Sequence, residues 1–171
     1  MRYMANKKVV NATPEEKYGI QFKSKLEGKM YGYLIDAGIT PDYEKYTYTL
    51  SPSMKTKVPF YNRTPKRGFH QMGSHVAPIT YTPDFTYDCN GLFVIIEAKG
   101  KENDIFPLKK NMFRKLLETM DFPVIFFEVR NKKELLESLE IAKKYSSTLR
   151  KSRKNYVNGI PRFKRNKLGR R

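Results

Sequence analysis

YTPDFTYDCNGLFVIIEAK, residues 81–99, is the stretch that most constrains the fold. Asn90-Gly91 separates two strand-like segments, Tyr81 to Tyr87 and Leu92 to Lys99, and this dipeptide favours a tight hairpin turn. Leu92 to Ile96 is a continuous apolar run, which is typical of a central strand covered on both faces. We therefore expect an antiparallel hairpin at the centre of a sheet.

The register of this hairpin brings two acids together. Pairing centred on Asn90-Gly91 sets Asp84 opposite Glu97 on one face of the sheet, with Cβ atoms roughly 5 Å apart. Strand alternation puts Lys99 on the same face. The alternative is structural: Glu97 and Lys99 form an ion pair at a strand end, and Asp84 is an acid beside a turn.

Opposed carboxylates beside a buried strand repel each other and lose hydration, and a divalent cation offsets both effects. Mg²⁺, with Mn²⁺ as a substitute, suits two carboxylates and a phosphate substrate. Such a cation polarises a phosphoryl oxygen and lowers the pKa of a bound water, as phosphodiester hydrolysis requires. Lys99 would orient that water and stabilise negative charge in the transition state.

The remaining elements predict an α/β fold. Thr13-Pro14-Glu15-Glu16 resembles a helix start, and apolar residues recur at helical spacing as far as Gly38. We expect strands over 43–50 and 124–129, and helices over 107–120 and from Asn131 through about Tyr145. The order α-β-β-β-α-β-α predicts one mixed central sheet flanked by helices.

Two basic regions lie outside this pattern. Residues 51–79 contain repeated Pro and Gly and are expected to form a long basic loop inserted in a domain spanning 13–145. Residues 1–12 are expected to be flexible, and 146–171 to form a basic tail. We expect DNA-binding bases in the loop, at the start of the helix over 107–120 and in the tail: Lys55, Lys57, Arg63, Lys66, Arg67, Lys109, Arg150, Lys151, Arg153 and Lys154. For Lys109, a solvated helix face is an equal alternative. His70 and His75 receive no role.

The charge of the chain favours a polyanionic partner. The net charge is +17, and residues beyond Glu140 carry twelve of the 34 Lys and Arg and no acid. Nucleic acid is preferred over two alternatives, a solubilising tail and a tail that binds anionic lipid headgroups. No apolar run is long enough to cross a bilayer, and no signal peptide is recognised. The single cysteine, Cys89, excludes an intramolecular disulfide and favours a reducing, cytoplasmic compartment.

A family resemblance follows from these motifs. Pro83-Asp84, then Glu97-Ala98-Lys99, resembles the signature of the PD-(D/E)xK nucleases, and Ser24-Lys25-Leu26-Glu27 resembles a helix motif of small phage nucleases related to endonuclease I and of transposon end-cleaving nucleases. The resemblance implies a restriction-endonuclease-like core over roughly residues 20–130. It also implies that Asp84, Glu97, Glu27 and the Ala98 carbonyl bind metal and that Lys99 is catalytic.

The same resemblance implies a phage-encoded endonuclease acting on branched DNA, such as a Holliday junction, in the host cytoplasm. Resolution of a symmetric junction would favour a homodimer. A nicking or double-strand endonuclease is one alternative. A non-catalytic nucleic-acid-binding or virion protein that keeps the fold is another.

Overall fold

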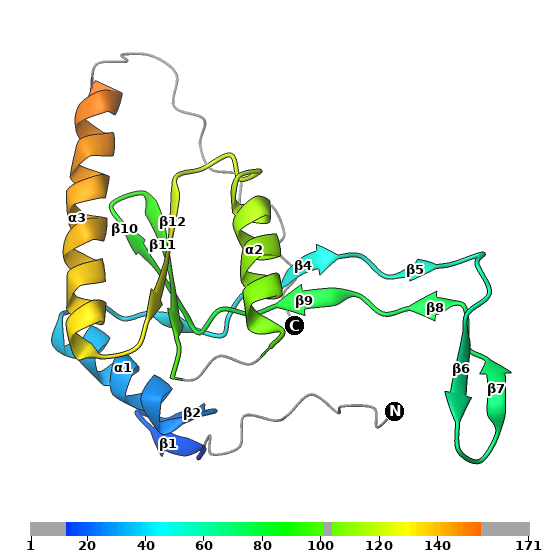
Figure 1. Cartoon of the computed structure of the whole chain (residues 1–171). Helices are drawn as coiled ribbons and strands as arrows, with labels where there is room; N and C mark the ends of the chain where they lie inside the picture. Colours follow the sequence, from blue (N-terminus) through cyan, green and yellow to red (C-terminus); the bar gives the residue numbers. More distant parts are fainter. Residues whose placement is uncertain (1–12, 101–103, 155–171) are drawn as a thin grey trace.

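The computed structural model describes residues 13–100 and 104–154, with side chains up to 150 in the second range. In these residues a mixed sheet is packed between helices, and a long two-stranded arm projects from one side (Figure 1). The helices are α1 (Lys25–Asp36), α2 (Phe106–Leu117) and α3 (Lys132–Lys154). The protein is therefore α/β, as its sequence predicts.

The sheet has the strand order β12-β11-β10-β3. These strands are β3 (Asp42–Tyr43), β10 (Phe85–Cys89), β11 (Leu92–Ala98) and β12 (Val124–Val129). The hairpin prediction is confirmed in its turn and register: Cys89 pairs with Leu92 and Phe85 with Ile96, and the turn residues Asn90 and Gly91 have φ of 55° and 84°. Its first strand, predicted over Tyr81 to Tyr87, begins only at Phe85, because Tyr81 pairs with Tyr48 instead. β11 pairs antiparallel with β10 and parallel with β12, so the sheet is mixed and β11 is central.

Side-chain alternation along β11 builds two cores. Val94 and Ile96 belong to a cluster that includes residues of α1 and α3, such as Met30 and Leu135. Ile95 points to the other face and joins a cluster with residues of α2, including Phe113 and Leu117. Complete burial of one such side chain is worth about 1.5–3 kcal/mol, so the two faces of β11 anchor all three helices.

The N-terminal helix prediction is wrong in its start. Residues 13–22 contain a small hairpin, β1 (Glu15–Lys17) and β2 (Ile20–Phe22), turned by Tyr18 and Gly19 at φ of 57° and 73°. The helix begins after Ser24, whose hydroxyl accepts a hydrogen bond from the amide of Glu27. Ser24 is thus the N-cap of α1, and the similar pattern at Thr13 starts no helix.

Other boundaries agree more closely. The end of α1 at Gly38 is confirmed, because the amides of Gly38 and Ile39 close a Schellman motif on the Ile35 and Leu34 carbonyls. β12 covers the predicted residues, and Asn131 caps α3 through the Glu134 amide. α3 continues to Lys154, nine residues beyond the predicted end, so the first part of the predicted tail is helical.

The strand predicted over 43–50 is divided. β3 ends at Tyr43, Glu44 has a positive φ of 43°, and β4 (Tyr48–Ser51) begins a separate pair with β9 (Ile79–Tyr81). The chain therefore leaves the sheet at Glu44 and returns to it only after Tyr81.

The predicted basic loop is a paired structure, which we call the arm (residues 48–81). Beyond β4 and β9 it contains β5 (Met54–Lys55), β6 (Tyr61–Thr64), β7 (Gly68–Gln71) and β8 (His75–Val76), and β5 pairs with β8 and β6 with β7. Prolines, which lack an amide donor, separate the short strands and gave the sequence its loop-like character: Pro52, Pro59, Pro65 and Pro78. Among the described residues, no helix is sufficiently long and apolar to cross a membrane.

Candidate active site

Asp84 and Glu97 meet where β10 begins and β11 nears its end. They lie one residue beyond the Phe85–Ile96 pair, and they are 8% and 6% exposed. Asp84 Oδ2 accepts a hydrogen bond of 2.7 Å from the Ala98 amide, which attaches the aspartate to the strand that carries Glu97. The structure therefore brings these two predicted residues together and adds a contact from the Ala98 amide; the predicted role concerned the Ala98 carbonyl.

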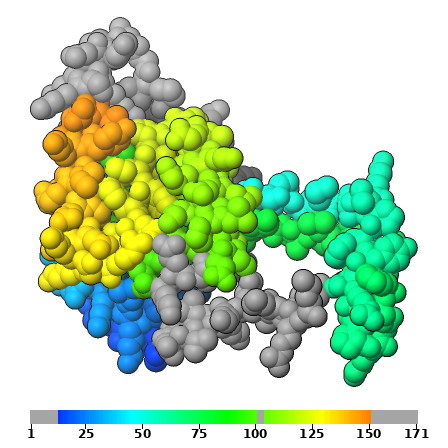
Figure 2. All heavy atoms as spheres, in the orientation of Figure 1, coloured from blue at the N-terminus to red at the C-terminus, as the bar shows by residue number. Residues whose placement is uncertain are grey.

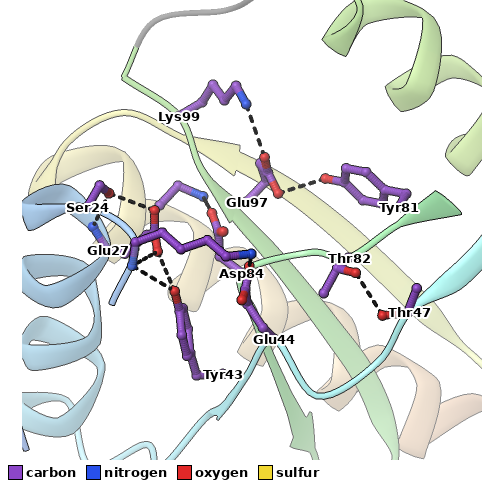
Figure 3. Close-up of polar contacts among 12 residues, drawn as sticks. Ser24, Glu27, Tyr43, Glu44, Thr47, Tyr81, Thr82, Asp84, Glu97 and Lys99 are labelled. Carbon is purple, nitrogen blue, oxygen red and sulfur yellow. Dashed lines mark hydrogen bonds and ion pairs between the residues drawn. The ribbon is translucent and has the colours of Figure 1, made fainter. Parts of the chain in front are cut away.

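Glu97 is held from two sides (Figure 3). The Tyr81 hydroxyl donates a buried hydrogen bond of 2.8 Å to Oε2, and Lys99 Nζ lies 3.4 Å from Oε1. The Lys99 ammonium also lies 3.9 Å from the centroid of the Phe106 ring. These contacts leave the Lys99 side chain only 16% exposed and fix its amine beside the carboxylate.

Glu27 joins the same site from α1. It is 8% exposed, and its carboxylate accepts hydrogen bonds from the Ser24 hydroxyl, the Lys23 amide and the Tyr43 hydroxyl. Glu27 does not form an ion pair with the Lys23 side chain, because Lys23 Nζ instead pairs with Glu44. Glu27 is thus both the helix-capping acid and a third carboxylate near the site.

The carboxylates interact electrostatically. Burial raises the pKa of Asp84 well above its usual value, and the negative charges of Glu97 and Glu27 raise it further. Burial also raises the pKa of Glu97, against the opposing effects of Tyr81 and Lys99. Removing two such acids from water without a compensating cation destabilises their charged forms, so the site favours binding of positive charge.

Glu128 extends the acidic site along the sheet. Its position in β12 is directly beside Glu97 in the parallel register, and its carboxylate contacts Lys110 Nζ at 2.7 Å and Arg130. Lys110 also lies 5.1 Å from the centroid of the Phe106 ring that contacts Lys99. Acids and bases therefore alternate across the carboxyl ends of β11 and β12.

Sequence reasoning missed several of these groups. Glu128 gave a usable signal, because it is the one charged residue in the apolar strand Val124–Val129. Tyr43 packs against Phe22 and Phe85, as an aromatic strand residue commonly does, but its hydroxyl also reaches Glu27, and its sequence position gave no sign of that contact. Tyr81 gave no signal, because its position depends on the pairing of the arm.

The predicted DNA-binding bases do not gather at this site. Five of them are exposed on the arm: Lys55, Lys57, Arg63, Lys66 and Arg67. Lys109 instead donates a hydrogen bond of 3.0 Å to the Thr80 carbonyl at the base of the arm. Arg150 is exposed near the far end of α3, and the side chains of Lys151, Arg153 and Lys154 lie outside the described residues, as does the segment 1–12.

Within the described residues, no three His, Cys, Asp or Glu side chains are arranged to enclose a metal ion. Asp84 and Glu97 form a two-carboxylate site, and Glu27 is engaged by its own hydrogen bonds. Mg²⁺ is commonly bound by one or two carboxylates together with substrate phosphates. Asp84 and Glu97 therefore fit a cation whose remaining coordination positions are filled by water and by a substrate phosphate.

The fold and site define an α/β protein with buried acids and a lysine at the end of the central strands of a mixed sheet. A family model described as a protein of unknown function (DUF1064) matches residues 2–133, and the chain belongs to this family. No curated protein and no solved structure matches the chain.

Proposed function

We propose that this protein is a metal-dependent endonuclease that hydrolyses DNA phosphodiester bonds. The observation that carries the proposal is the pair of buried carboxylates, Asp84 and Glu97, with Lys99 fixed 3.4 Å from Glu97. The sheet with helices on both faces supports a restriction-endonuclease-like core. The elements that surround the carboxylate pair come in this chain order: α1, β3, β10, β11, α2 and β12.

Asp84 and Glu97 are the proposed ligands of Mg²⁺ or Mn²⁺. Their burial and mutual repulsion support this role, since a cation would offset both. When bound, such a cation polarises the scissile phosphate and makes a bound water more acidic. The Ala98 amide keeps the Asp84 carboxylate in place, and Tyr81 does the same for Glu97. Both ligands are therefore preorganised before substrate arrives.

Lys99 is the proposed catalytic residue that acts on the attacking water. Its contacts with Glu97 and the Phe106 ring restrict the amine to the edge of the carboxylate pair, where a nucleophilic water would stand beside the phosphate. An ammonium held there orients the water and stabilises the extra negative charge of the transition state. Glu27 supports the site from α1 by adding negative charge near Asp84.

The proposed substrate is branched DNA, and the proposed setting is the cytoplasm of a phage-infected host. The net charge of +17 supports a nucleic-acid partner. A homodimer is proposed because a symmetric junction requires two symmetric cuts.

The test is cleavage of supercoiled plasmid and of a four-way junction, with Mg²⁺ or with EDTA. We expect Mg²⁺-dependent cleavage that is abolished in Asp84→Asn and Glu97→Gln and lowered about 100-fold or more in Lys99→Ala, with DNA binding retained. Asp88→Asn is the matched control, because Asp88 is an exposed acid on the same hairpin, at the turn away from the site. Full activity in the Asp84 and Glu97 variants would refute the proposed site. DNA binding without any cleavage would favour the non-catalytic alternative.

A further inference from the structure

The tip of the arm is a small hairpin with two unlike faces. β6 and β7 pair so that Arg63 stands opposite Phe69 and Tyr61 opposite Gln71. These four residues are exposed, whereas the residues alternating with them are partly covered. Phe69 is 73% exposed and Tyr61 55%. One face of the tip therefore presents two aromatic side chains, and Arg63 shares that face, opposite Phe69 and two residues from Tyr61 on the same strand.

The charge of the arm is of one sign. Residues 51–79 contain five Lys or Arg and no Asp or Glu, and Lys66 and Arg67 occupy the turn between β6 and β7. Figure 2 shows the arm extending away from the body as a narrow projection. No acid within the arm can therefore neutralise these bases.

Exposed aromatic rings interleaved with cations indicate a particular class of partner. Exposed apolar side chains that gather on one face commonly mark a binding site, whereas single ones are ordinary. Aromatic rings stack on unpaired bases, and neighbouring Lys and Arg bind the phosphates that flank them. A second copy of the arm is a poor partner, because two arms without acids would repel each other.

We propose that the tip of the arm binds DNA at a branch or break where bases are unstacked. Tyr61 and Phe69 stack on those bases, and Arg63, Lys66 and Arg67 bind the adjacent phosphates. The proposal rests on the proposed function, from which it takes DNA as the partner. It adds that the arm is the part of the protein that recognises the branch.

The base of the arm connects this surface to the candidate active site. Tyr81, the last residue of β9, donates its hydroxyl hydrogen bond to Glu97, and Lys109 of α2 binds the carbonyl of the preceding Thr80. These contacts hold the base of the arm against the site. DNA bound at the tip would therefore be held in a defined direction from Asp84 and Glu97.

The first experiment measures binding in EDTA, so that it does not depend on cleavage. The probes are a four-way junction carrying 2-aminopurine at the branch point and an intact duplex of the same length. We expect Tyr61→Ala/Phe69→Ala to weaken junction binding by roughly 25-fold, about 5-fold for each stacked base, with little change on duplex. The change in 2-aminopurine fluorescence on binding should be lost. Phe69→Trp should retain both properties, because it keeps a stacking ring.

Matched controls come from the body of the protein. Tyr145→Ala removes an aromatic ring of similar exposure, 47%, from α3 and should bind both probes like the parent. Lys66→Gln/Arg67→Gln should weaken binding to both probes and reduce the slope of log K against log salt by up to about 1.8. Arg114→Gln/Lys115→Gln, an adjacent exposed pair in the last turn of α2, should change that slope less.

Unchanged junction affinity and fluorescence in the Tyr61/Phe69 variant, with the fold intact by circular dichroism, would overturn the proposal. A changed sedimentation mass with unchanged DNA binding would also overturn it, because the tip would then be a protein interface. Tip-dependent binding without Mg²⁺-dependent cleavage would refute the proposed function alone. Cleavage of branched DNA at subsaturating concentration that is unaffected by the tip variants would refute this inference alone.

Discussion

Tyr81→Phe is the most informative single substitution, because it removes only the hydroxyl through which the base of the arm contacts Glu97. The ring should stay in place, since it is 6% exposed and packs 4.6 Å from Phe113, centroid to centroid. What is lost is a buried hydrogen bond of 2.8 Å to Glu97, and a hydrogen bond to a charged group is worth about 1.5–3 kcal/mol. For a chain of this length, a loss of about 2 kcal/mol corresponds to a fall in Tm of roughly 4–8 °C.

The effect on the site should exceed the effect on stability. Loss of a group that orients a metal ligand typically costs 10- to 100-fold in metal affinity or activity. We therefore expect the Mg²⁺ concentration for half-maximal cleavage to rise about 10- to 100-fold, with partial recovery of the rate at high Mg²⁺. A residue with only a packing role would not change the Mg²⁺ requirement.

Tyr48→Phe is the matched control for this substitution. Tyr48 pairs with Tyr81 across β4 and β9, is 3% exposed and packs on the same Phe113 ring. Burial raises the pKa of Tyr48 to about 12, and Glu97 has no part in that shift. Equal Mg²⁺ requirements in Tyr81→Phe and Tyr48→Phe would refute the reasoning that Tyr81 positions Glu97.

Two further predictions concern charge. Because the pKa of Asp84 is raised in the folded protein, the stability contributed by its protonated form is present at low pH and is lost as pH rises from the usual carboxyl pKa through the raised one. In EDTA, Asp84→Asn should therefore gain stability relative to the parent over that pH range, by about 1.4 kcal/mol for each unit by which the pKa is raised, and equal melting temperatures across the range would contradict this. Deleting residues 155–171, which hold six Lys or Arg and no acid, should weaken DNA binding and flatten its salt dependence by up to about 5 in the log–log slope. The cleavage rate at saturating DNA should survive this deletion, and its loss in a folded protein would place the segment in the catalytic groove.

The parts of the fold that the sequence predicted well are local. Asn90-Gly91 fixes a turn, the turn fixes the register, and the register fixes where Asp84 and Glu97 stand. The same holds for Asn131, whose side chain caps α3 through a residue three positions away. Each of these features is decided by residues close together in the chain, so no knowledge of distant packing was required.

The failures have a long-range cause. The capping pattern at Thr13-Pro14-Glu15-Glu16 extended the first helix back to Thr13, although the Tyr18-Gly19 turn belongs to a hairpin that packs on α1. A Cβ at Gly32 would stand 2.8 Å from the Tyr18 hydroxyl, so the Tyr18 side chain packs on α1 at a position where the helix lacks a side chain. Such contacts between separate elements leave no periodic signal in the sequence.

The candidate site depends both on residues close together in the chain and on contacts between distant segments. Its proposed reactive groups, Asp84, Glu97 and Lys99, come from one hairpin and could be placed by counting residues. The groups that hold them in position come from elsewhere: Tyr43 reaches Glu27 across 16 residues, and Tyr81 reaches Glu97 from the base of the arm. A carboxylate pair is a common occurrence in sequences, but two tyrosine hydroxyls from distant segments directed at acids of one site require the complete fold. The specific geometry at Glu97 therefore depends on the arm, and a variant of the arm's base should affect the site even though it lies outside the hairpin.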